Sequence, residues 1–570
     1  MTPHTATPPP RPSALARFGP LAIVLVAIGL VAGLASTGRD ATSTAATSGS
    51  TQQAGTGDKF LPVSFQEAQK QGKVADYDFG DSCDPKTGRL EIPSTWSPPC
   101  LAAKPGVEGG ATYQGVTPTE IRVVMYEAAD DDLSASLSSK TDSPEATRDT
   151  AEKLLVMYQQ LYNTWGRRLK VIPLKGSGSD ETSSRADARK VAVELKAFAS
   201  IGGPGQESAY AEELARRGVL CIGCGLAVPD STLQKYAPFM WGGLQTPEQY
   251  LLNLGDFIIE RLNGDKASFA GDPKIQEQTR RFGVVHFEQD PPVYGGVEDM
   301  VDKEGGARGY KAAVNLTYQL VIADLPEKAR VLVSRLKEAK VTSVIFLGDP
   351  IMPIYLTKAA TAQNYFPEWI ITGTVLTDTT TFGRLYDQKQ WAHAYGLSSL
   401  PARTPKQLGD AWRLYTWFYG KDPAAKGTLA VISPGISQFM LGVHMAGPHL
   451  TPETFRDGMF SYPPTGGTPL SPRISFGDHG TFAQPDYTGT DDMTVIWWNA
   501  EATGKDEQGV EGKGMMMYAD GGKRYLPGEM PSTPANVFDP KGAVMIYDTI
   551  PPDQAPPEYP SPGPGGKQGN

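Results

Sequence analysis

Two cysteines spaced as in thiol–disulfide exchange motifs, Cys221 and Cys224, are the first residues of this sequence that could support chemistry. Exchange needs a thiolate with a lowered pKa, such as a cysteine acquires at the start of a helix. Here the pair ends an expected strand, Val219–Ile222, so nothing in the sequence lowers either pKa. A local disulfide that stiffens the following loop, or two reduced cysteines in the core, fits the pattern better than a redox enzyme.

Six histidines offer a second possible chemistry, but they form no recognised metal or catalytic motif. The nearest approach is His444 and His449, whose spacing is interrupted by Gly447 and Pro448, so the two rings cannot share a helical face. The sequence also has no nucleophile elbow, phosphate loop or dinucleotide fingerprint. We therefore expect no catalytic residue, no metal site and no cofactor, and we expect that the chain is not an enzyme.

A glycine-rich turn, Gly202–Gly205, delivers Gln206, Glu207 and Ser208 to the start of an expected helix. Backbone N–H groups at a helix start are unpaired and lie at the positive end of the helix dipole, so this segment suits an anion such as a carboxylate. Glu207 would partly cancel that attraction unless its side chain points outward. The alternative is that Ser208 simply caps or supports the helix start.

The acidic run Tyr126–Asp132 follows the first long strand of the expected core. Its simplest interpretation is a solvated loop. It could also attract a cationic ligand such as a polyamine or basic peptide, or bind a hard cation such as calcium weakly. The sequence alone does not separate these interpretations.

The bulk composition is that of an ordinary globular protein of more than one compact lobe. The chain has 570 residues, of which 40% are hydrophobic and 20% charged. Its formal net charge of −10 argues against nucleic acid as a partner, because an acidic surface repels a phosphate backbone and no Lys/Arg stripe with interleaved aromatics is present.

The N-terminal residues have the pattern of an exported protein. Arg11 and Arg17 precede an uncharged stretch, Phe18–Gly38, which as a helix would reach about 30 Å. Residues 1–38 are therefore expected to be either a cleaved export signal or a single membrane anchor, and residues 39–58 a flexible tether. The rest of the chain would then lie at the extracellular face of the membrane.

The two ends of the exported part are also distinctive. Residues 59–112 form an N-terminal extension in which Cys83 and Cys100 are expected to pair, since disulfides persist in an oxidising exterior. The closed loop is short, and its closure would contribute about 3 kcal/mol in the chain-entropy model. Residues 551–570 are rich in proline and glycine, which predicts a disordered tail.

Between these ends, short β-branched runs alternate with helical patterns. Strands are expected at Glu120–Met125, Arg168–Leu174, Ala197–Ile201, Val219–Ile222, Phe282–Phe287, Lys311–Leu316, Ser343–Leu347 and Thr494–Trp498. Helices are expected at Ser143–Trp165, Ser184–Leu195, Glu207–Arg217, Pro247–Leu262 and Pro326–Ala339, with more helix near 405–420 and 437–445. This order predicts an α/β fold in which parallel sheets are flanked by helices and ligands bind at the carboxyl ends of the strands.

Four local patterns, in this order and spacing, carry a resemblance to a known family. They are GVTPTEIRVVM (Gly115–Met125), IGGPGQESAYAEELARRGVLCI (Ile201–Ile222), HFEQDPPVYGGV (His286–Val297), and VIFLGDP (Val344–Pro350) with its later WIITG (Trp369–Gly373). Over roughly residues 113–530 the chain resembles the type I periplasmic binding proteins, in particular the leucine/isoleucine/valine-binding-like substrate-binding proteins of ABC transporters.

The resemblance implies a two-lobed domain over residues 113–550 that closes on a solute. Each lobe would be a mostly parallel sheet flanked by helices, with lobe 1 at about 113–245, lobe 2 at about 246–372, and later segments added to both. Closure on a ligand would present the closed form to an ABC transporter permease in the membrane. Catalysis is not implied.

Carried over position by position, the resemblance implies these ligand-binding residues: Gln206, Ser208, Ala227, Tyr294, Asp349 and Asp378. Two of the positions depart from the amino-acid binders of the family. Leu226 and Ala227 stand where a small hydroxyl residue commonly meets the ligand carboxylate. Val375 stands where a carboxylate commonly meets the α-ammonium, so Asp349 or Asp378 would have to take that role.

We therefore expect an extracytoplasmic solute-binding protein that captures a small polar organic ligand, such as an amino acid, an amide or a related compound. The departures make a simple branched-chain amino acid a poorer candidate than the family name suggests. The alternative is a ligand sensor or scaffolding protein with the same two-lobed ectodomain, which would need no permease.

Overall fold

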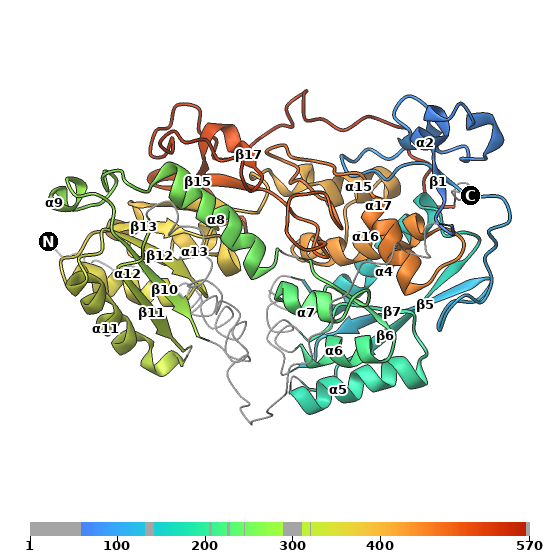
Figure 1. Cartoon of the computed structure of the whole chain (residues 1–570), viewed down its shortest axis with the longest axis horizontal. Helices are drawn as coiled ribbons and strands as arrows, with labels where there is room; N and C mark the ends of the chain where they lie inside the picture. Colours follow the sequence, from blue (N-terminus) through green and yellow to red (C-terminus); the bar gives the residue numbers. More distant parts are fainter. Residues whose placement is uncertain are drawn as a thin grey trace, which may run out of the picture.

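Two α/β lobes lie side by side in the protein (Figure 1). The computed structural model describes residues 59–130, 142–178, 180–204, 208–224, 228–243, 245–288, 310–319 and 321–565. The expected export segment and tether, residues 1–58, therefore lie outside the described residues. Each lobe has its own hydrophobic core.

Lobe 1 is built on a five-stranded parallel sheet. In spatial order its strands are β6 (Arg168–Lys175), β5 (Glu120–Glu127), β7 (Ala199–Ile201), β8 (Leu220–Ile222) and β9 (Met240–Trp241). Its helices are α4 (Pro144–Leu161), α5 (Glu181–Arg189), α6 (Ala209–Arg216), α7 (Asp230–Lys235), α15 (Asp410–Tyr419), α16 (Leu429–Ala446) and α17 (Pro452–Ser461). The last three come from far later in the chain than the sheet they cover.

Lobe 2 has a larger, mixed sheet. Its order is β11 (Val314–Tyr318), β10 (Phe282–Phe287), β12 (Ser343–Leu347), β13 (Glu368–Ile371), β14 (Ala394–Ser398), β15 (Met493–Lys505) and β16 (Glu511–Tyr518), with β17 (Arg524–Tyr525) paired to β15. The first five strands are parallel to one another. Strand β15 pairs antiparallel with β14, and β16 and β17 each pair antiparallel with β15. Its helices are α8 (Pro247–Arg261), α9 (Pro273–Gln276), α11 (Leu325–Glu338), α12 (Met352–Ala362), α13 (Thr380–Gly383) and α14 (Gln388–Trp391).

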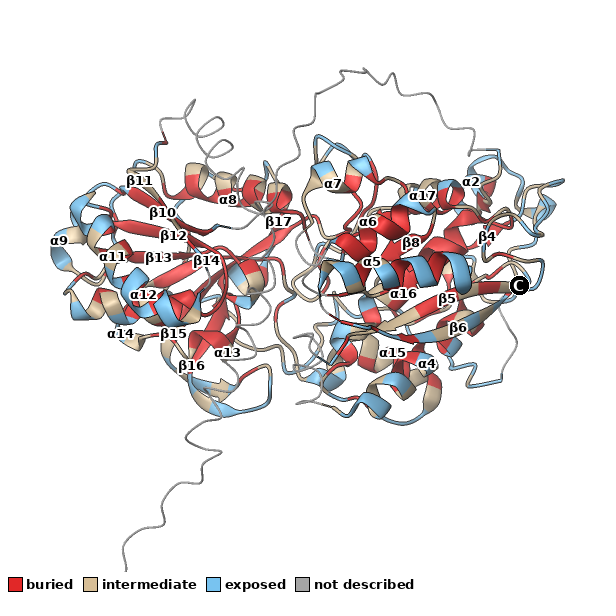
Figure 2. Cartoon of the chain, turned by 90° about the horizontal axis from the view of Figure 1, so that it is seen from below, coloured by how far each residue is buried: buried red, intermediate tan, exposed pale blue. Residues whose placement is uncertain are grey.

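The helices begin where the sequence supplies caps. Ser143 accepts a hydrogen bond from the backbone N–H of Ala146 at the start of α4, and Pro144 takes the first helical position, where no N–H is needed. Thr246 and Gln249 form a reciprocal capping box at the start of α8. Figure 2 shows the result, with buried strands at the centre of each lobe and exposed outer helix faces.

The expected α/β fold of mostly parallel sheets flanked by helices is confirmed. Strands β10 and β12 have the predicted bounds, whereas β11 begins three residues later than expected, at Val314. The helix expected from Ser184 starts earlier, at Glu181, because Asp180 caps it, and it ends in a π-helical turn, Lys190–Glu194.

The chain passes between the lobes at 242–246, 402–410 and 487–493, and again where it returns to lobe 1 after Tyr547. Backbone bonds tie these crossings together, since Gly242 donates to the carbonyl of Tyr487 at 3.0 Å and Ala402 donates to that of Pro469 at 2.8 Å. The guanidinium of Arg524 also donates to the carbonyls of Ser399 and Leu400. The lobes are therefore joined by several bonded segments rather than by one linker.

The N-terminal extension packs on lobe 1. Its disulfide between Cys83 and Cys100 is present, with an S–S distance of 2.01 Å, so the expected pairing is confirmed. Apolar side chains of the extension, Phe65, Leu90 and Leu101, join the lobe 1 core.

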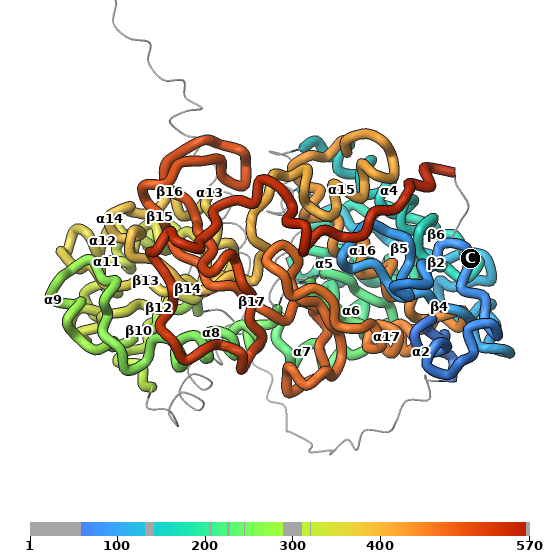
Figure 3. Tube along the Cα trace, turned by 90° about the horizontal axis from the view of Figure 1, so that it is seen from above, coloured from blue at the N-terminus to red at the C-terminus, as the bar shows by residue number. Residues whose placement is uncertain are grey.

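The proline-rich tail differs from the expectation of disorder as far as residue 565. It runs from lobe 2 across to lobe 1 (Figure 3), where the Trp417 indole donates to the carbonyl of Tyr559 at 2.8 Å and the Tyr559 hydroxyl donates to Asp84 at 2.9 Å. Gln160 bonds the backbone of both Gly563 and Gly565. Proline prevents a helix or central strand, but an extended chain still orders when the folded body satisfies its backbone groups.

Within the described residues, α16 is the one helix long and apolar enough to span a membrane. Most of its side chains are buried in the lobe 1 core, among them Phe439, Met440 and Val443. A helix apolar on nearly all sides is expected at the centre of a large soluble lobe. We therefore assign α16 to the core.

Candidate functional site

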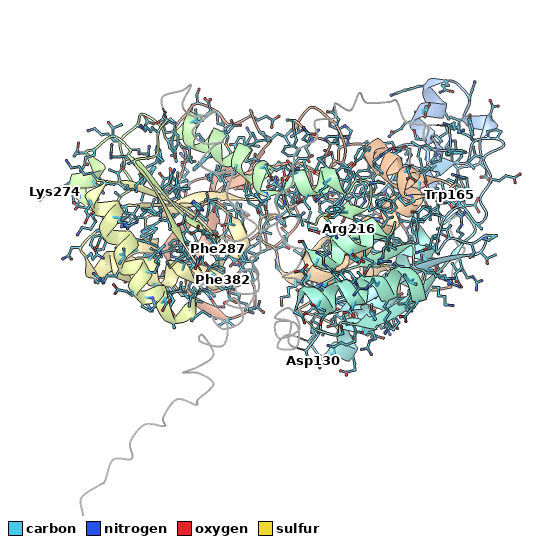
Figure 4. The ribbon with its side chains drawn as sticks, turned by 60° about the horizontal axis from the view of Figure 1, so that its bottom comes forward. Asp130, Trp165, Arg216, Lys274, Phe287 and Phe382 are labelled. Carbon is cyan, nitrogen blue, oxygen red and sulfur yellow. A yellow bond between two sulfur atoms is a disulfide. The ribbon has the colours of Figure 1, made fainter. Side chains whose placement is uncertain are left out.

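The carboxyl ends of the strands in both sheets adjoin the junction between the lobes. The first crossing leaves lobe 1 directly from the end of β9, and the second leaves lobe 2 from the end of β14. Because parallel strands end at one edge of a sheet, the other strand ends share those edges. In Figure 4, Phe287 at the end of β10 and Phe382 of α13 lie on the side of lobe 2 nearest lobe 1, and Asp130, just after β5, lies on the facing side of lobe 1.

Of the lobe 1 residues expected to bind ligand, Ser208 is described. It is the N-cap of α6 but makes no capping bond, and its exposed hydroxyl donates to Glu212 Oε1 at 3.3 Å. Its carbonyl also accepts from the backbone N–H of Glu212 at 2.9 Å, so Ser208 supports the first turn of α6 without a side-chain cap. Gln206 and Ala227 of lobe 1, and Tyr294 of lobe 2, lie outside the described residues.

Cys221 and Cys224 form a disulfide that is almost wholly buried at the end of β8. It also packs against the loop after β7, because a Cβ on Gly203 would lie 3.1 Å from the Cβ of Cys224. Gly202 donates to the carbonyl of Ile222 at 2.9 Å. Of the alternatives set out above, the local disulfide is the one observed, and it ties the exit loop of β8 to the end of that strand, beside the loop after β7.

Asp349, after β12, is buried and fully engaged within lobe 2. One carboxylate oxygen accepts from the backbone N–H groups of Ile351 and Met352 at 2.7 and 2.9 Å, and the other accepts from the Tyr318 hydroxyl. Burial raises the pKa of this carboxyl, although these hydrogen bonds act in the opposite direction. Asp349 thus orders the turn into α12, and its contacts leave little capacity for a ligand ammonium.

Asp378, after β13, is buried too but only half engaged. Its Oδ2 accepts from the Ser398 hydroxyl at 2.5 Å, whereas Oδ1 has no partner among the described residues. Burial raises the pKa of Asp378 to about 7, and the charge of Glu507 adds to this. Near neutral pH, Asp378 is therefore partly protonated, and its free oxygen can donate or accept a hydrogen bond.

The backbone between β13 and Asp378 is strained. Val375 and Leu376 both adopt left-handed conformations, with φ of 42° and 64°. This conformation is unfavourable for non-glycine residues, especially a β-branched one, and such strain concentrates at ligand-binding and switch segments. The turn buries Asp378 and leaves the Leu376 side chain 43% exposed.

Gln245, on the first crossing, is a candidate that the sequence did not reveal. Its side chain is 2% exposed, and within the described part of the chain neither Nε2 nor Oε1 has a hydrogen-bond partner. A buried amide without partners is costly, by about 1–3 kcal/mol per group, and calls for a water or ligand to satisfy it. The sequence marks Gln245 only by its position, because it directly precedes the capping box of α8.

Carboxyl groups gather where the crossings meet. Gln249 of α8 donates to Asp486 Oδ1 at 2.8 Å and accepts from Thr488 at 2.9 Å, which joins the first and third crossings. Burial raises the pKa of Asp230 to about 6, and the nearby charges of Glu248 and Asp486 reinforce this. The junction is thus acidic and partly protonated near neutral pH.

The third crossing carries two adjacent carboxyls with different partners. Asp492 is paired with Arg524 at 2.8 Å, and both side chains are buried. Asp491 accepts from Ser475 at 2.7 Å but leaves Oδ1 without a partner among the residues described. Burial raises the pKa of Asp491 to about 8.

The acidic run after β5 is partly neutralised. Glu127 pairs with Arg148 at 2.6 Å, and Asp130 pairs with Lys175 at 2.9 Å. Asp131 and Asp132 lie outside the described residues. The described part of this run therefore presents ion pairs rather than free carboxylates to a cation.

His444 and His449, which the sequence singles out by their spacing, have separate structural roles. His444 is buried between the backbone N–H of Asn163 and the carbonyl of Pro99, and burial lowers its pKa to about 4. His449 stacks on Phe60 with ring centroids 4.2 Å apart. In the described ranges, no three His, Cys, Asp or Glu side chains gather as a metal site would require.

No family model matches the sequence, and no curated protein matches it. Solved structures do match the fold at low identity. A solute-binding protein of an ABC transporter from Rhodopseudomonas palustris, in complex with 4-hydroxybenzoate, has a TM-score of 0.47 at 12% identity, covering 72% of this chain and 97% of that one.

Two further solved structures are similar. The branched-chain amino acid transporter substrate-binding protein from Streptococcus pneumoniae, in complex with isoleucine, has a TM-score of 0.43 at 11% identity, covering 70% and 99% of the two chains. A type 1 periplasmic binding protein from Bordetella pertussis has a TM-score of 0.44 at 12% identity, covering 66% and 96%.

Proposed function

We propose that the chain is an extracytoplasmic solute-binding protein that captures a small organic molecule between its lobes. The observation that carries this proposal is the arrangement of the crossings. They leave from the carboxyl ends of β9 and β14, so the loops that follow the parallel strands of both sheets adjoin one junction. A ligand that contacts loops of both lobes binds the closed arrangement more tightly and therefore shifts the population toward it.

The partner on this proposal is an ABC transporter permease that recognises the closed form. Residues 1–38 would hold the chain at the extracellular face of the cell membrane, or the chain would be released after these residues are cleaved. Residues 39–58 would then give the lobes freedom of movement above the membrane. The extension enters the fold on lobe 1, so this lobe is the one nearer the tether.

The test is thermal unfolding of residues 59–565 against a library of amino acids, amides, short peptides, polyamines, aromatic acids and metal ions. A ligand specific to the folded state raises the midpoint, by an amount equivalent to about 2.7 kcal/mol at a hundredfold excess over Kd. Small-angle scattering with the same compound should show a smaller radius of gyration. A library with no active member would contradict the proposal.

A second candidate is a sensor or scaffold with the same lobes. The observation that favours it is that both carboxyls expected to bind an ammonium are used within the protein. Asp349 accepts from the turn into α12, and Asp378 accepts from Ser398. Pull-down from membranes distinguishes the two. A transport role requires a permease that binds better with solute present, and a scaffold binds its partner without solute.

A further inference from the structure

We propose that the solute is an uncharged molecule with an apolar body and an amide or hydroxyl head group. Val431 and Leu376 would contact its body, and Gln245 would bind its head group. The inference rests on the proposed function and names the substrate class of that site.

Val431 lies near the start of α16, at the carboxyl edge of the lobe 1 sheet. Its side chain is 77% exposed, although α16 is otherwise a core helix. The helix runs from the carboxyl edge of the lobe 1 sheet to its amino edge, because a Cβ on Gly435 would lie 3.4 Å from Ile201 at the end of β7, whereas His444 bonds Asn163 before β6. Val431 is four residues, about 6 Å, before Gly435 and so lies at the carboxyl edge.

The neighbours of Val431 on α16 are also apolar. Ala430 and Pro434 are exposed beside it. The start of α16 is fixed by Asp142, which accepts from the backbone N–H groups of Gly427 and Thr428 at 2.7 Å. Lobe 1 therefore presents a rigid aliphatic surface at the edge where ligands bind in parallel α/β sheets.

Lobe 2 presents an aliphatic surface at the corresponding place. The strained turn at Val375 and Leu376 exposes Leu376 and buries Asp378 beneath it. A turn that is locally unfavourable but retained points to a role for the side chain it displays. Exposed aliphatic groups on both edges are suited to burying the apolar body of one ligand on closure.

Several of the described charges at the same edges have partners within the protein. Glu127, Asp130 and Asp349, which follow β5 and β12, have the partners described above. The exception is Glu288 after β10, whose exposed carboxylate would attract a cation only weakly because water screens it. The buried carboxyl oxygens that have no partner among the described residues of the junction belong instead to Asp378 and Asp491.

The polar atoms left over suit an uncharged head group. Gln245 has a donor and an acceptor without partners, and Asp378 has one such oxygen. A primary amide can satisfy both atoms of the Gln245 side chain at once, and an alcohol can satisfy either of them. A carboxylate head group would lose its hydration without gaining a counter-ion among these atoms, which is strongly unfavourable. An ammonium group would have to form a buried ion pair with Asp378, and the loss of hydration of both charges offsets much of their attraction.

The first experiment varies the head group on a fixed body. Thermal unfolding of residues 59–565 is followed with leucine and with the carboxylic acid, amine, primary amide and alcohol that share its carbon skeleton, and with the equivalent phenylalanine series. We expect the amide or alcohol of a series to raise the midpoint most. A larger rise with the amino acid, the carboxylate or the amine would overturn the inference.

The wider library separates this inference from the function beneath it. If only polyamines, sugars or metal ions raise the midpoint, the protein binds solutes and the substrate class proposed here is wrong. If no compound raises it, both proposals fail.

The second experiment varies the protein. With the active amide or alcohol as probe, Val431→Asp and Leu376→Asp should each raise Kd at least tenfold while the midpoint of the empty protein stays unchanged, because both side chains are exposed. Val156→Asp is the matched control, since Val156 is 54% exposed on α4 of lobe 1. Glu288→Gln should leave Kd unchanged. A tenfold loss in that variant, or equal losses in Val156→Asp and Val431→Asp, would contradict the proposal.

Discussion

Ser398 donates a 2.5 Å hydrogen bond to Asp378 and so ties the last residue of β14 to the turn that follows β13. The same turn exposes Leu376, and the second crossing to lobe 1 begins just after Ser398. One buried carboxyl therefore links the turn that exposes Leu376 to the strand end from which the second crossing leaves.

This relationship predicts a pH dependence of stability. The pKa of Asp378 is raised to about 7 in the fold, against about 3.9 when unfolded, so its contribution is complete below about pH 4 and is lost as pH rises through 7. Asp378→Asn should remove a fall in unfolding free energy of about 1–3 kcal/mol between roughly pH 5 and pH 8. Urea unfolding of wild type and Asp378→Asn at several pH values measures this pH-dependent change in unfolding free energy.

The pH dependence of unfolding in Asp491→Asn should be compared with that in Asp378→Asn. The pKa of Asp491 is raised to about 8, so its part of the fall should extend about one pH unit higher. Identical pH profiles for wild type and Asp378→Asn would show that Asp378 does not titrate in this range.

Removal of the tail should destabilise the protein. A chain ending at residue 550 loses the contacts of Tyr559 with Trp417 and Asp84 and those of Gln160. At about 1 kcal/mol for each net hydrogen bond, we expect a loss of about 2–4 kcal/mol in calorimetry or urea unfolding. A chain ending at residue 565 is the control and should match the full-length protein, and equal stability of all three would exclude a docked tail.

The two disulfides should differ in their effect on stability. Cys83 and Cys100 are 17 residues apart and Cys221 and Cys224 only 3, so the former closes the longer loop. In the chain-entropy model, Cys83→Ser/Cys100→Ser should cost about 1.5 kcal/mol more than Cys221→Ser/Cys224→Ser. Urea unfolding under non-reducing conditions compares them, and the reverse order would mean that packing around Cys224 dominates.

Gln245→Met should separate stability from binding. The variant replaces an amide with no partners by an apolar side chain of similar size, so the empty protein should gain about 1–2 kcal/mol of unfolding free energy. On the inference above, it should also bind the active amide or alcohol more weakly. A destabilised Gln245→Met would instead indicate that ordered water satisfies the amide in the empty protein.

Local patterns predicted most of the fold. The β-branched run of β10 and the cap-and-proline start of α8 lie where the sequence placed them, because their causes are local. The tail is the opposite case. Its order depends on Trp417 and Gln160, which are more than a hundred residues away in the chain, and nothing near the prolines reveals those partners.

The candidate site was less accessible to prediction. Asp349 and Asp378 were placed correctly after their strands, but which oxygen remains free depends on Tyr318 and Ser398, each from another strand. Gln245 gave no chemical signal, since a glutamine is informative only when its lack of partners is known. Ser208 remains a prediction as a ligand contact, as do Gln206, Ala227 and Tyr294 beyond the described residues.

The docked extension and the returning tail place both described chain ends on lobe 1, at Lys59 and residue 565. A fusion partner, surface linker or fluorophore at either end would therefore hold or mark the same lobe. If the lobes close as proposed, the distances that report closure have to be measured to a label placed within lobe 2, such as at the exposed β15–β16 turn around Val510.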